Sequence, residues 1–486
     1  MTKPLVEPQT LKGCQDLLPE DMISRNAVIG KIQRVYEKFG FSPIDTPALE
    51  HLVTLVGTGG AEINKDLFRL ESPEREPLAL RFDLTVPFAR LIAQYPEKLK
   101  LPFRRYHIGP VFRADDPAPG RYRQFTQFDI DIAGVHSVVA DAEIVATMCE
   151  SLRAVGLRSA EPASGSLTQE FQVRINNRKL VDALLVGNGI ADENTQKHVL
   201  RVIDKLQKVG IDSVRDELGQ GRVDKSGDPI PGVGLPAKVI GKIVAFISLT
   251  GNSRGAIMQS LAEVLPSSEA TELALAEMAD LSSALVALRV SETDAVFDPS
   301  LTRGLDYYTG PVFEASIPNS SLGSFMGGGR YDRLVERFLD TSIPATGASI
   351  GVDRLMYTLK QLGKVDPIQT PSQVIVISLP GVPSHEMLVV ASELRAADLP
   401  TEAYIADGSV SMRDQLSYAN SKGVPIAVIL GEDEIKTGQV SVKDLRAGKE
   451  VRAGIQDREE YRKAGRSAQV TVSRGELLRV VKEMLV

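Results

Sequence analysis

Residues 103 to 134, FRRYHIGPVFRADDPAPGRYRQFTQFDIDIAG, show the clearest hairpin pattern in the chain. Two strand-like runs flank a loop rich in proline and glycine, and alternate side chains of a strand share one face. The runs carry Arg113, Arg121, Arg123, Phe125, Gln127, Asp129 and Asp131. Guanidinium groups beside an aromatic ring suit a polyphosphate and a stacked base. A surface Arg/Asp ladder between paired strands would give the same pattern, so both interpretations stay open.

A second polar stretch, RGLDYYTGPVFE, occupies residues 303 to 314. It predicts a hairpin, with a strand over Leu305–Tyr308, a turn at Thr309-Gly310 and a returning strand over Val312–Ile317. Neither face of this hairpin is plainly apolar, which favours a role in lining a site. An edge hairpin with hydrogen-bonded phenols and a surface arginine is the alternative.

Two glycine-bearing stretches follow. In FMGGGRYDRLVERF (325 to 338) three glycines run into a predicted helix, which allows a close approach of the backbone to a ligand or a neighbouring strand. The stretch lacks the Lys and Ser/Thr of a phosphate-binding P-loop. PATGASIGVDRLMYTL (344 to 359) predicts a strand of small residues that leads into a helix, with Arg354 in the first turn, where the helix dipole favours anions.

Composition limits the class of protein. A chain of 486 residues should form several domains, and 43% hydrophobic with 24% charged residues is ordinary for a globular protein. Two cysteines provide no disulfide framework, and neither a signal peptide nor a membrane span is visible, so we expect a cytoplasmic location. The net charge of −7 argues mildly against a general nucleic-acid coat.

Together these stretches resemble the histidine–tRNA ligase family of class II aminoacyl-tRNA synthetases, over essentially the whole chain. GFSPIDTPALEH (41 to 52) is similar to motif 1 of that class, the 103 to 125 stretch to motif 2, and PATGASIGVDRLMY to motif 3. RGLDYYTGPVFE is similar to the family's histidine signature, and LRFDLTVPFAR (80 to 90) to the segment that contacts the amino acid's ammonium group. Asp83 and FDIDIAG (128 to 134) look like the eukaryotic-type branch.

The resemblance implies an α/β (α+β) architecture. An antiparallel-sheet catalytic core would occupy 1–177 and 291–363, with a helical insertion at 178–290. A linker at 364–372 would lead to an α/β anticodon-binding domain at 373–486. It also implies a homodimer through motif 1.

The implied reaction joins L-histidine to tRNA(His) through a histidyl-adenylate, with ATP and Mg²⁺. Arg303 and Arg113 would be catalytic. Arg303 would bridge the histidine carboxylate and the α-phosphate, and Arg113 would hold the α-phosphate from the other side. The implied ATP-binding residues are Arg113, Arg121, Phe125 and Arg354. The implied histidine-binding residues are Asp83, Thr85, Gln127, Asp131, Arg303, Tyr307 and Tyr308. The resemblance assigns no protein ligand to the metal ion.

Three other interpretations deserve comparison. One is the family's regulatory paralogue, which acts with ATP phosphoribosyltransferase in histidine biosynthesis and typically lacks the C-terminal domain. A class II enzyme for another amino acid would not need the 303 to 314 signature. A structural or signalling protein with an inactive site would not need the full set of arginines.

The motif 2 loop, RADDPAPGR (113 to 121), carries two carboxylates, Asp115 and Asp116. In the family this loop faces the acceptor end of the tRNA. The carboxylates could accept hydrogen bonds from base amino groups, which would reduce dependence on a 5′ phosphate. Alternatively, they face solvent or pair with Arg121 and Arg123.

Overall fold

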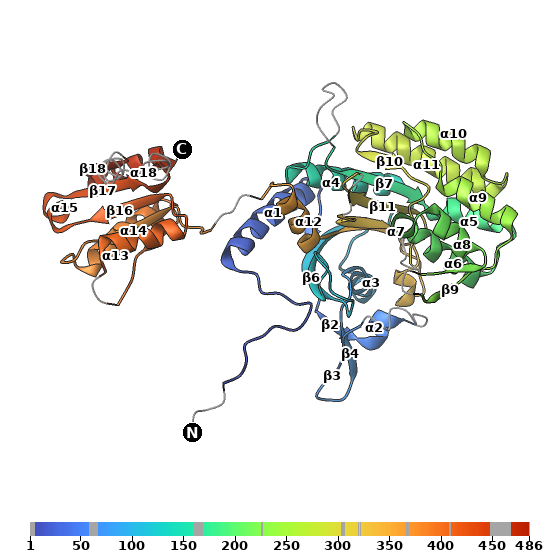
Figure 1. The fold of residues 1–486 in the computed structure, drawn as a ribbon, viewed down its shortest axis with the longest axis horizontal. Helices are drawn as coiled ribbons and strands as arrows, with labels where there is room; N and C mark the ends of the chain where they lie inside the picture. Colours follow the sequence, from blue (N-terminus) through green and yellow to red (C-terminus); the bar gives the residue numbers. More distant parts are fainter. Residues whose placement is uncertain are drawn as a thin grey trace. The chain divides into compact units, whose positions relative to one another are not determined.

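The computed structural model describes residues 5–57, 67–159, 169–224, 227–302, 307–318, 320, 322–365, 369–407, 410–447 and 468–485 (Figure 1). Two compact units are present, one formed by Met1–Asp16 with Val28–Lys364 and the other by Leu17–Ala27 with Val365–Val486. Within the described part of the chain, every helix is too short or too polar to cross a bilayer.

The elements of the N-terminal part are α1 (Pro19–Lys38), β1 (Ser42–Pro43), β2 (Leu49–His51), α2 (Leu52–Val56), β3 (Arg69–Glu71), β4 (Pro77–Leu80), α3 (Thr85–Gln94), β5 (Phe103–Phe112), β6 (Gln124–Ala133), α4 (Val139–Ala154) and β7 (Gln172–Asn177). The helical segment contains α5 (Arg178–Val186), α6 (Glu193–Asp204), α7 (Leu206–Val209), α8 (Ile211–Leu218), β8 (Gly221–Val223), β9 (Pro229–Pro231), α9 (Ala237–Ile247), α10 (Arg254–Val264) and α11 (Glu269–Ala287). It is followed by β10 (Ala295–Phe297), β11 (Pro311–Ser316), β12 (Met326–Arg330), η2 (Val335–Arg337), β13 (Ala345–Gly351) and α12 (Val352–Gln361).

An eight-stranded sheet in the order β1-β5-β6-β13-β12-β11-β7-β10 organises the larger unit. Its end pairs, β1 with β5 and β10 with β7, are parallel, and the pairs between them are antiparallel. The predicted hairpin at 103 to 134 and the predicted strand-to-helix step at 344 to 359 are both confirmed, as β5–β6 and β13–α12. The antiparallel sheet expected for the core is therefore present.

Helix α4 covers one face of this sheet and leaves the other face for the polar residues. It packs against β6, β13, β12, β11 and β7. Arg330 of β12 and Thr346 of β13 both bond to Asp141 of α4, so these two side chains face the helix. Because side chains alternate along a strand, the neighbouring Gly329 and Gly347 face the opposite side, where the predicted binding residues of β6 lie.

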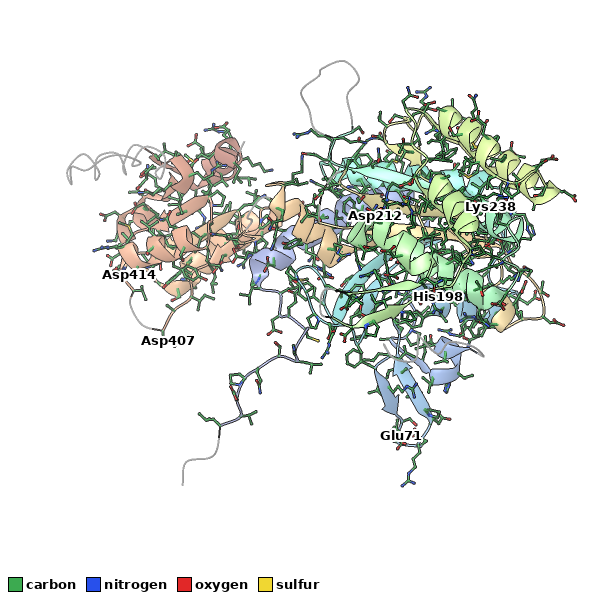
Figure 2. The ribbon with its side chains drawn as sticks, turned by 45° about the vertical axis from the view of Figure 1, so that its right-hand side comes forward. Glu71, His198, Asp212, Lys238, Asp407 and Asp414 are labelled. Carbon is green, nitrogen blue, oxygen red and sulfur yellow. The ribbon has the colours of Figure 1, made fainter. Side chains whose placement is uncertain are left out.

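The segment between α5 and α11 is mostly helical, as its sequence predicts, and the β8–β9 pair interrupts it. Helix α9 buries Ile240, Ile243 and Phe246 at helical spacing. Charged residues such as Asp212 and Lys238 are exposed on the same segment (Figure 2). A smaller three-stranded sheet has the order β2-β4-β3, and Glu71 is the last residue of its edge strand β3.

The C-terminal unit is a mixed α/β domain, as predicted. Its elements are β14 (Val374–Ser378), α13 (Ser384–Ala396), β15 (Thr401–Ala403), α14 (Met412–Ser421), β16 (Ile426–Leu430), α15 (Glu432–Thr437), β17 (Gln439–Asp444), β18 (Gln469–Ser473), η3 (Arg474–Glu476) and α18 (Leu477–Leu485). The strand order is β15-β14-β16-β17-β18. Val374 and Val376 pack with α13 and α18, whereas Ile375 and Ile377 pack with α14, so alternate residues of β14 bury both faces of the sheet.

One sequence prediction about the sheet is wrong. β11 does not form the predicted hairpin with Tyr307 and Tyr308, because β12 and β7 occupy both of its edges. Residues 307–310 run as turn and irregular backbone, and Arg303, Leu305 and Asp306 lie outside the described residues. The three glycines of 327–329, expected to run into a helix, lie within β12.

Candidate active site

The register of β5 and β6 builds the floor of a buried polar site. Arg105 lies opposite Asp131, and His107 lies opposite Asp129, all four on one face of the sheet. All four side chains are almost fully buried. Asp83 reaches the same site from the turn before α3, where its carboxylate accepts a hydrogen bond from the Val86 backbone N–H at 3.1 Å. Three carboxylates thus meet below the protein surface.

Arg105 is the fully buried cation of this cluster. Its Nη2 lies 2.6 Å from Asp131 Oδ2 and 3.9 Å from Asp129 Oδ2, and its guanidinium covers the ring of Phe88 at 4.4 Å. His107 adds no charge at neutral pH, because burial and the guanidinium groups of Arg105 and Arg81 lower its pKa to about 3. Its Nε2 lies 3.0 Å from Asp45 Oδ1.

Burial dominates the ionisation of the carboxylates. It raises the pKa of Asp131 to about 7, although Arg105 opposes the shift, while the charge of Asp129 adds to it. It raises the pKa of Asp129 to about 6, against Arg105 and a hydrogen bond from Ser349. Burial likewise raises the pKa of Asp83. Such a site favours a cationic ligand, since a positive charge placed among the carboxylates would stabilise their ionised forms.

Two glycines and two tyrosines shape the space around Asp131. A Cβ at Gly347, opposite Asp131 on β13, would overlap the Asp131 carboxylate, so only glycine fits there. The Tyr331 hydroxyl donates to Asp131 Oδ1. The ring of Tyr308 lies over Gly329, the cross-strand partner of Gly347, so Tyr308 and Asp131 share one face.

Tyr307 packs beside this group rather than pointing away from it. Its ring centroid is 5.0 Å from that of Tyr308 and 6.0 Å from that of Tyr331. Burial, followed by the nearby phenol of Tyr308 and the carboxylate of Asp83, raises the pKa of Tyr307, while a hydrogen bond with Thr85 lowers it. The structure therefore brings Asp83, Thr85 and Tyr307 into contact range.

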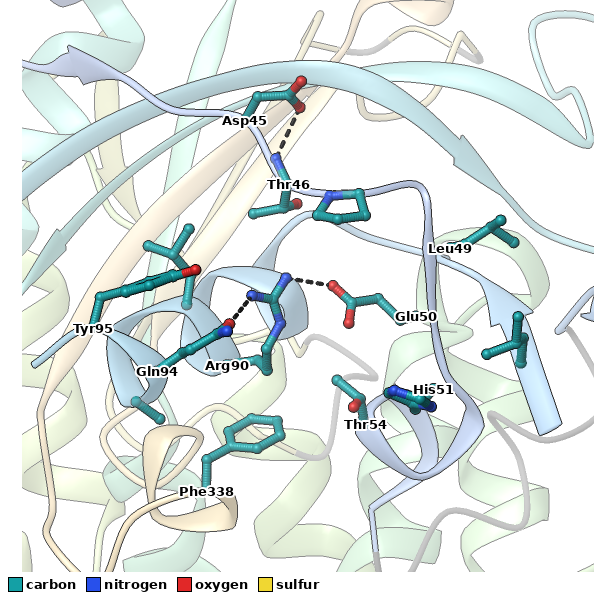
Figure 3. A pocket seen from close by; sticks show the side chains of 14 residues that line it. Asp45, Thr46, Leu49, Glu50, His51, Thr54, Arg90, Gln94, Tyr95 and Phe338 are labelled. Carbon is teal, nitrogen blue, oxygen red and sulfur yellow. Dashed lines mark hydrogen bonds and ion pairs between the residues drawn. The ribbon is translucent and has the colours of Figure 1, made fainter. Parts of the chain in front are cut away.

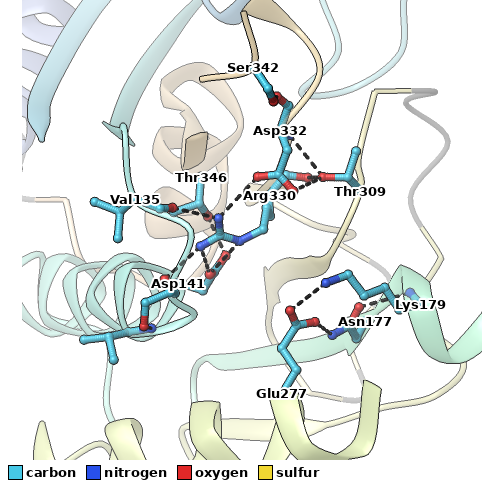
Figure 4. Close-up of polar contacts among 12 residues, drawn as sticks. Val135, Asp141, Asn177, Lys179, Glu277, Thr309, Arg330, Asp332, Ser342 and Thr346 are labelled. Carbon is cyan, nitrogen blue, oxygen red and sulfur yellow. Dashed lines mark hydrogen bonds and ion pairs between the residues drawn. The ribbon is translucent and has the colours of Figure 1, made fainter. Parts of the chain in front are cut away.

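A buried ion pair anchors the backbone that carries the tyrosines. Arg330 donates to Asp141 of α4, to the backbone oxygens of Val135 and Ser137, and to Asp332 (Figure 4). The Thr309 N–H donates to the Arg330 backbone oxygen at 2.8 Å, and its hydroxyl bonds to Asp332 at 2.8 Å. This network holds Thr309 directly beside Tyr308, in place of the hairpin that the sequence predicted.

The predicted phosphate-binding residues lie at the loop end of the β5–β6 hairpin. Arg113 Nε donates to the Phe82 backbone oxygen at 3.0 Å, and its guanidinium lies 5.2 Å from the ring centre of Phe125. Arg354 begins α12, and its Nη1 donates to the Ser324 backbone oxygen at 3.1 Å. Burial and then the nearby Arg121 guanidinium lower the pKa of Arg354. Neighbouring guanidinium groups at a helix start suit a polyanion.

The acidic loop has a local partner. Arg121 donates to Asp115 Oδ2 from Nε at 3.1 Å and from Nη2 at 2.7 Å, and Arg123 donates to the Asp115 backbone oxygen. The alternative interpretation, in which Asp115 pairs with its neighbouring arginine, therefore describes this structure better than a carboxylate free to read a base. Asp116 is exposed.

Sequence reasoning missed Arg105 and Tyr331 and gave Asp129 no role. Side chains alternate along β5, so residues 105, 107 and 109 share a face, and this pattern could have placed Arg105 opposite Asp131. Nothing local could have shown that it is fully buried. Arg303, the most important predicted catalytic residue, lies outside the described residues. Among the described residues, no three His, Cys, Asp or Glu side chains are arranged to hold a metal ion.

A separate groove of about 810 Å³ lies along the motif 1 segment (Figure 3). Its lining includes Asp45, Leu49, His51, Tyr95 and Phe338. On its floor Arg90 Nη2 of α3 pairs with Glu50 Oε1 of β2 at 2.6 Å, and Arg90 Nη1 donates to Gln94. Leu49 at its edge is 48% exposed.

An antiparallel sheet with guanidinium groups over one strand pair, followed by an α/β domain, defines a class II aminoacyl-tRNA synthetase. A family model described as histidyl-tRNA synthetase matches residues 13–355, and one described as anticodon binding domain matches residues 373–484. A histidine–tRNA ligase of Caulobacter vibrioides is 38% identical over 491 residues, which cover 99% of this chain and 97% of the relative. The chain belongs to the histidyl-tRNA synthetase family.

Solved structures agree. The crystal structure of histidyl-tRNA synthetase from Nostoc sp. PCC 7120 matches with a TM-score of 0.80 and 30% identity, and the match covers 99% of this chain and 100% of that one. A protein from Bacillus halodurans described as an ATP phosphoribosyltransferase regulatory subunit/histidyl-tRNA synthetase matches with a TM-score of 0.68 and 25% identity, covering 86% and 97%. The relatives from Caulobacter, Rhizobium and Brucella are bacterial, so the assignment to a eukaryotic-type branch is not supported.

Proposed function

We propose that this chain attaches L-histidine to tRNA(His) in two steps, through a histidyl-adenylate made from ATP. Membership of the histidyl-tRNA synthetase family supports this reaction, and the buried carboxylates beside a guanidinium-lined loop carry the assignment to this site. The reaction brings a carboxylate toward a polyanion, so it needs cations where negative charge accumulates. ATP and tRNA both occur in the cytoplasm, which we propose as the location.

On the nucleotide side, Arg113 binds the α-phosphate, Arg121 and Arg354 bind the outer phosphates, and Phe125 stacks on adenine. The proximity of Arg121 to Arg354 supports a shared polyanion, because two guanidinium groups otherwise repel each other. When ATP binds, the Arg121 guanidinium must release the Asp115 carboxylate and bind a phosphate group instead. Mg²⁺ enters with ATP, whose phosphates and bound water supply most of its ligands.

On the histidine side, Asp131 and Tyr308 bind the two imidazole nitrogens, and Asp83, Thr85 and Gln127 bind the ammonium group. Tyr307 forms the pocket wall. The paired glycines Gly329 and Gly347 support the first assignment, because each leaves room for one of the two imidazole ligands. Arg303 is proposed, from the family signature alone, to bridge the histidine carboxylate and the α-phosphate.

We further propose that the chain acts as a homodimer, with the 810 Å³ groove beside motif 1 covered by a second copy. The half-exposed Leu49 and the Arg90–Glu50 pair would then be removed from solvent. We also propose that the helical insertion spans residues 178–290 and that the anticodon-binding domain spans residues 373–486. The match of an anticodon-binding family model to residues 373–484 supports the latter and disfavours the shorter regulatory paralogue.

The direct test is histidine-dependent exchange of pyrophosphate into ATP, followed by charging of tRNA(His). Arg303→Ala should slow adenylate formation at least about 100-fold, because one charge-stabilising donor contributes about 3 to 4 kcal/mol to the transition state. A wild-type protein with no exchange activity would support the regulatory alternative. Normal exchange in the Arg303 variant would remove that residue from its role while leaving the function intact.

A further inference from the structure

Four buried acceptor oxygens at the site have no hydrogen-bond partner among the described residues, and one of them, Oδ2 of Asp131, forms an ion pair with Arg105 at 2.6 Å. The other three have neither a hydrogen bond nor an ion pair there. They are Oδ2 of Asp83, Oε1 of Gln127 and Oδ1 of Asp129. Buried polar atoms are nearly always paired, because an unpaired one has lost its hydrogen bonds to water and gained none in the protein. Three orphaned acceptors together indicate a missing donor group rather than a chance packing defect.

The three residues belong to one small region. Gln127 and Asp129 are two positions apart on β6, so they share a face. Asp83 interacts electrostatically with both Asp129 and Asp131. The turn that carries Asp83 lies against β5, because Arg113 Nε bonds to the Phe82 backbone oxygen and Arg105 Nη2 bonds to the Leu84 backbone oxygen.

Ser349 fixes the direction of two of these acceptors. Gln127 Nε2 donates to Ser349 Oγ at 2.8 Å, which leaves the amide oxygen as the free end. The Ser349 hydroxyl hydrogen-bonds to the carboxylate of Asp129, its cross-strand partner. Ser349 is therefore a positioning residue, because it orients both acceptors without using either free oxygen.

Charge argues for a cation rather than water. The groups that face the cluster are the carboxylates Asp83, Asp129 and Asp131, the buried guanidinium of Arg105, and Arg113 and Arg337 at longer range. Arg113 is committed to phosphate in the proposed reaction. At close range, three carboxylates face one guanidinium, and a primary ammonium would supply both the missing charge and three N–H donors.

We propose that Asp129 is a substrate-contacting specificity residue that, with Asp83 and Gln127, receives the three N–H groups of the histidine α-ammonium. This inference rests on the proposed function and puts Asp129, a carboxylate that the family resemblance did not assign, in the place of Thr85, whose side chain hydrogen-bonds to Tyr307. In this arrangement Asp131 binds the imidazole ring of histidine and Asp129 binds its α-ammonium group, although the two residues are only two positions apart on one strand.

A matched ligand pair tests the division of labour. L-Histidinol and 3-(imidazol-4-yl)propan-1-ol share the ring and the hydroxyl and differ only in the amino group. Their dissociation constants would be measured by calorimetry on the full chain. Asp129→Asn should reduce the preference for histidinol at least about tenfold, since it weakens a charged hydrogen bond. Asp131→Asn should weaken both ligands and leave that preference nearly unchanged.

Two further measurements distinguish the loss of a ligand contact from a folding defect. Ser349→Ala should reduce the same preference by a smaller factor, with a wild-type thermal midpoint. Near pH 6.5, Asp129→Asn should reduce the proton release on binding histidinol more than that on binding its deamino partner, because the ammonium ionises Asp129. Comparing the two forms of the protein at one ligand cancels the titration of the ligand's own imidazole. An unchanged preference in Asp129→Asn, or an equal change in proton release for both ligands, would overturn the inference while histidine-dependent exchange kept the proposed function. If the wild-type protein showed no histidine-dependent exchange, both the proposed function and the inference about Asp129 would be wrong.

Discussion

Replacing Gly347 with alanine should separate histidine binding from ATP binding. The new Cβ would lie 2.5 Å from Cγ of Asp131 and 2.5 Å from the Ile130 backbone oxygen, whereas ordinary contacts begin near 3.4 Å. The carboxyl carbon must therefore move by about 0.9 Å. Misplacing a binding group by about 1 Å can cost about 100-fold, so we expect KM for histidine to rise about 10- to 100-fold. KM for ATP should change little, since Arg113 and Arg354 do not contact Gly347.

The assay is histidine-dependent ATP–pyrophosphate exchange at varied histidine, together with urea denaturation. Overpacking should also cost about 1 to 3 kcal/mol of unfolding free energy. Gly351→Ala, at the end of the same strand, is the matched control, because its Cβ would meet nothing closer than 3.8 Å. In an Asp131→Ala background the stability cost of Gly347→Ala should shrink, since only the Ile130 contact remains. An unchanged KM for histidine in Gly347→Ala would refute this account of the pocket.

Three other outcomes are expected. Arg330→Met should lower the unfolding free energy by about 3 to 5 kcal/mol in urea denaturation, because it leaves Asp141 buried and unpaired; a loss below about 1 kcal/mol would contradict this. The pKa of Asp129 (about 6) and of Asp131 (about 7) exceed the ordinary 3.8, so the folded protein holds more protons than the unfolded chain between about pH 4 and 7. Their contribution to the unfolding free energy is therefore complete below about pH 4 and is lost as pH rises to about 7. Asp131→Asn should make this fall in unfolding free energy less steep when denaturation is measured at several pH values; the same slope in wild type and variant would contradict this. A chain ending at Lys364, whose Nζ still bonds to the Gly156 oxygen, should keep pyrophosphate exchange but lose tRNA charging, and normal charging would require another role for the C-terminal domain.

Local sequence sufficed wherever a structure depends on neighbouring residues. The β5–β6 hairpin follows from alternation around a proline-rich loop, and the β13–α12 step follows from small residues running into a helical pattern. The mixed C-terminal domain follows from continuous apolar strands between helices. In the hairpin the paired strands are close along the chain, so residue type and period indicate their pairing. For β13 and β14 the partner strands are far along the chain, and residue type and period indicate only the kind of element.

Tertiary structure was needed wherever a residue's role depends on distant partners. Tyr307 and Tyr308 were predicted to lie in a strand paired with β11, but β7 and β12 already occupy the edges of β11, and Arg330 and Asp332 hold Thr309 instead. The run of glycines is explained only by a neighbouring strand, because a Cβ at Gly328 would lie 2.6 Å from the Ala348 Cα.

The same limit applies to the site. Sequence alone proposed Asp83, Gln127 and Asp131 as binding residues through a family resemblance, and it did not indicate the burial of Arg105 or the free oxygen of Asp129. Whether a charged side chain ends in solvent or beneath a sheet is decided by elements that pack on it from elsewhere in the chain. For Asp129 those elements are the turn before α3, β5 and β13, and their desolvation of the carboxylate raises its pKa, which suits the cation-binding role proposed for it.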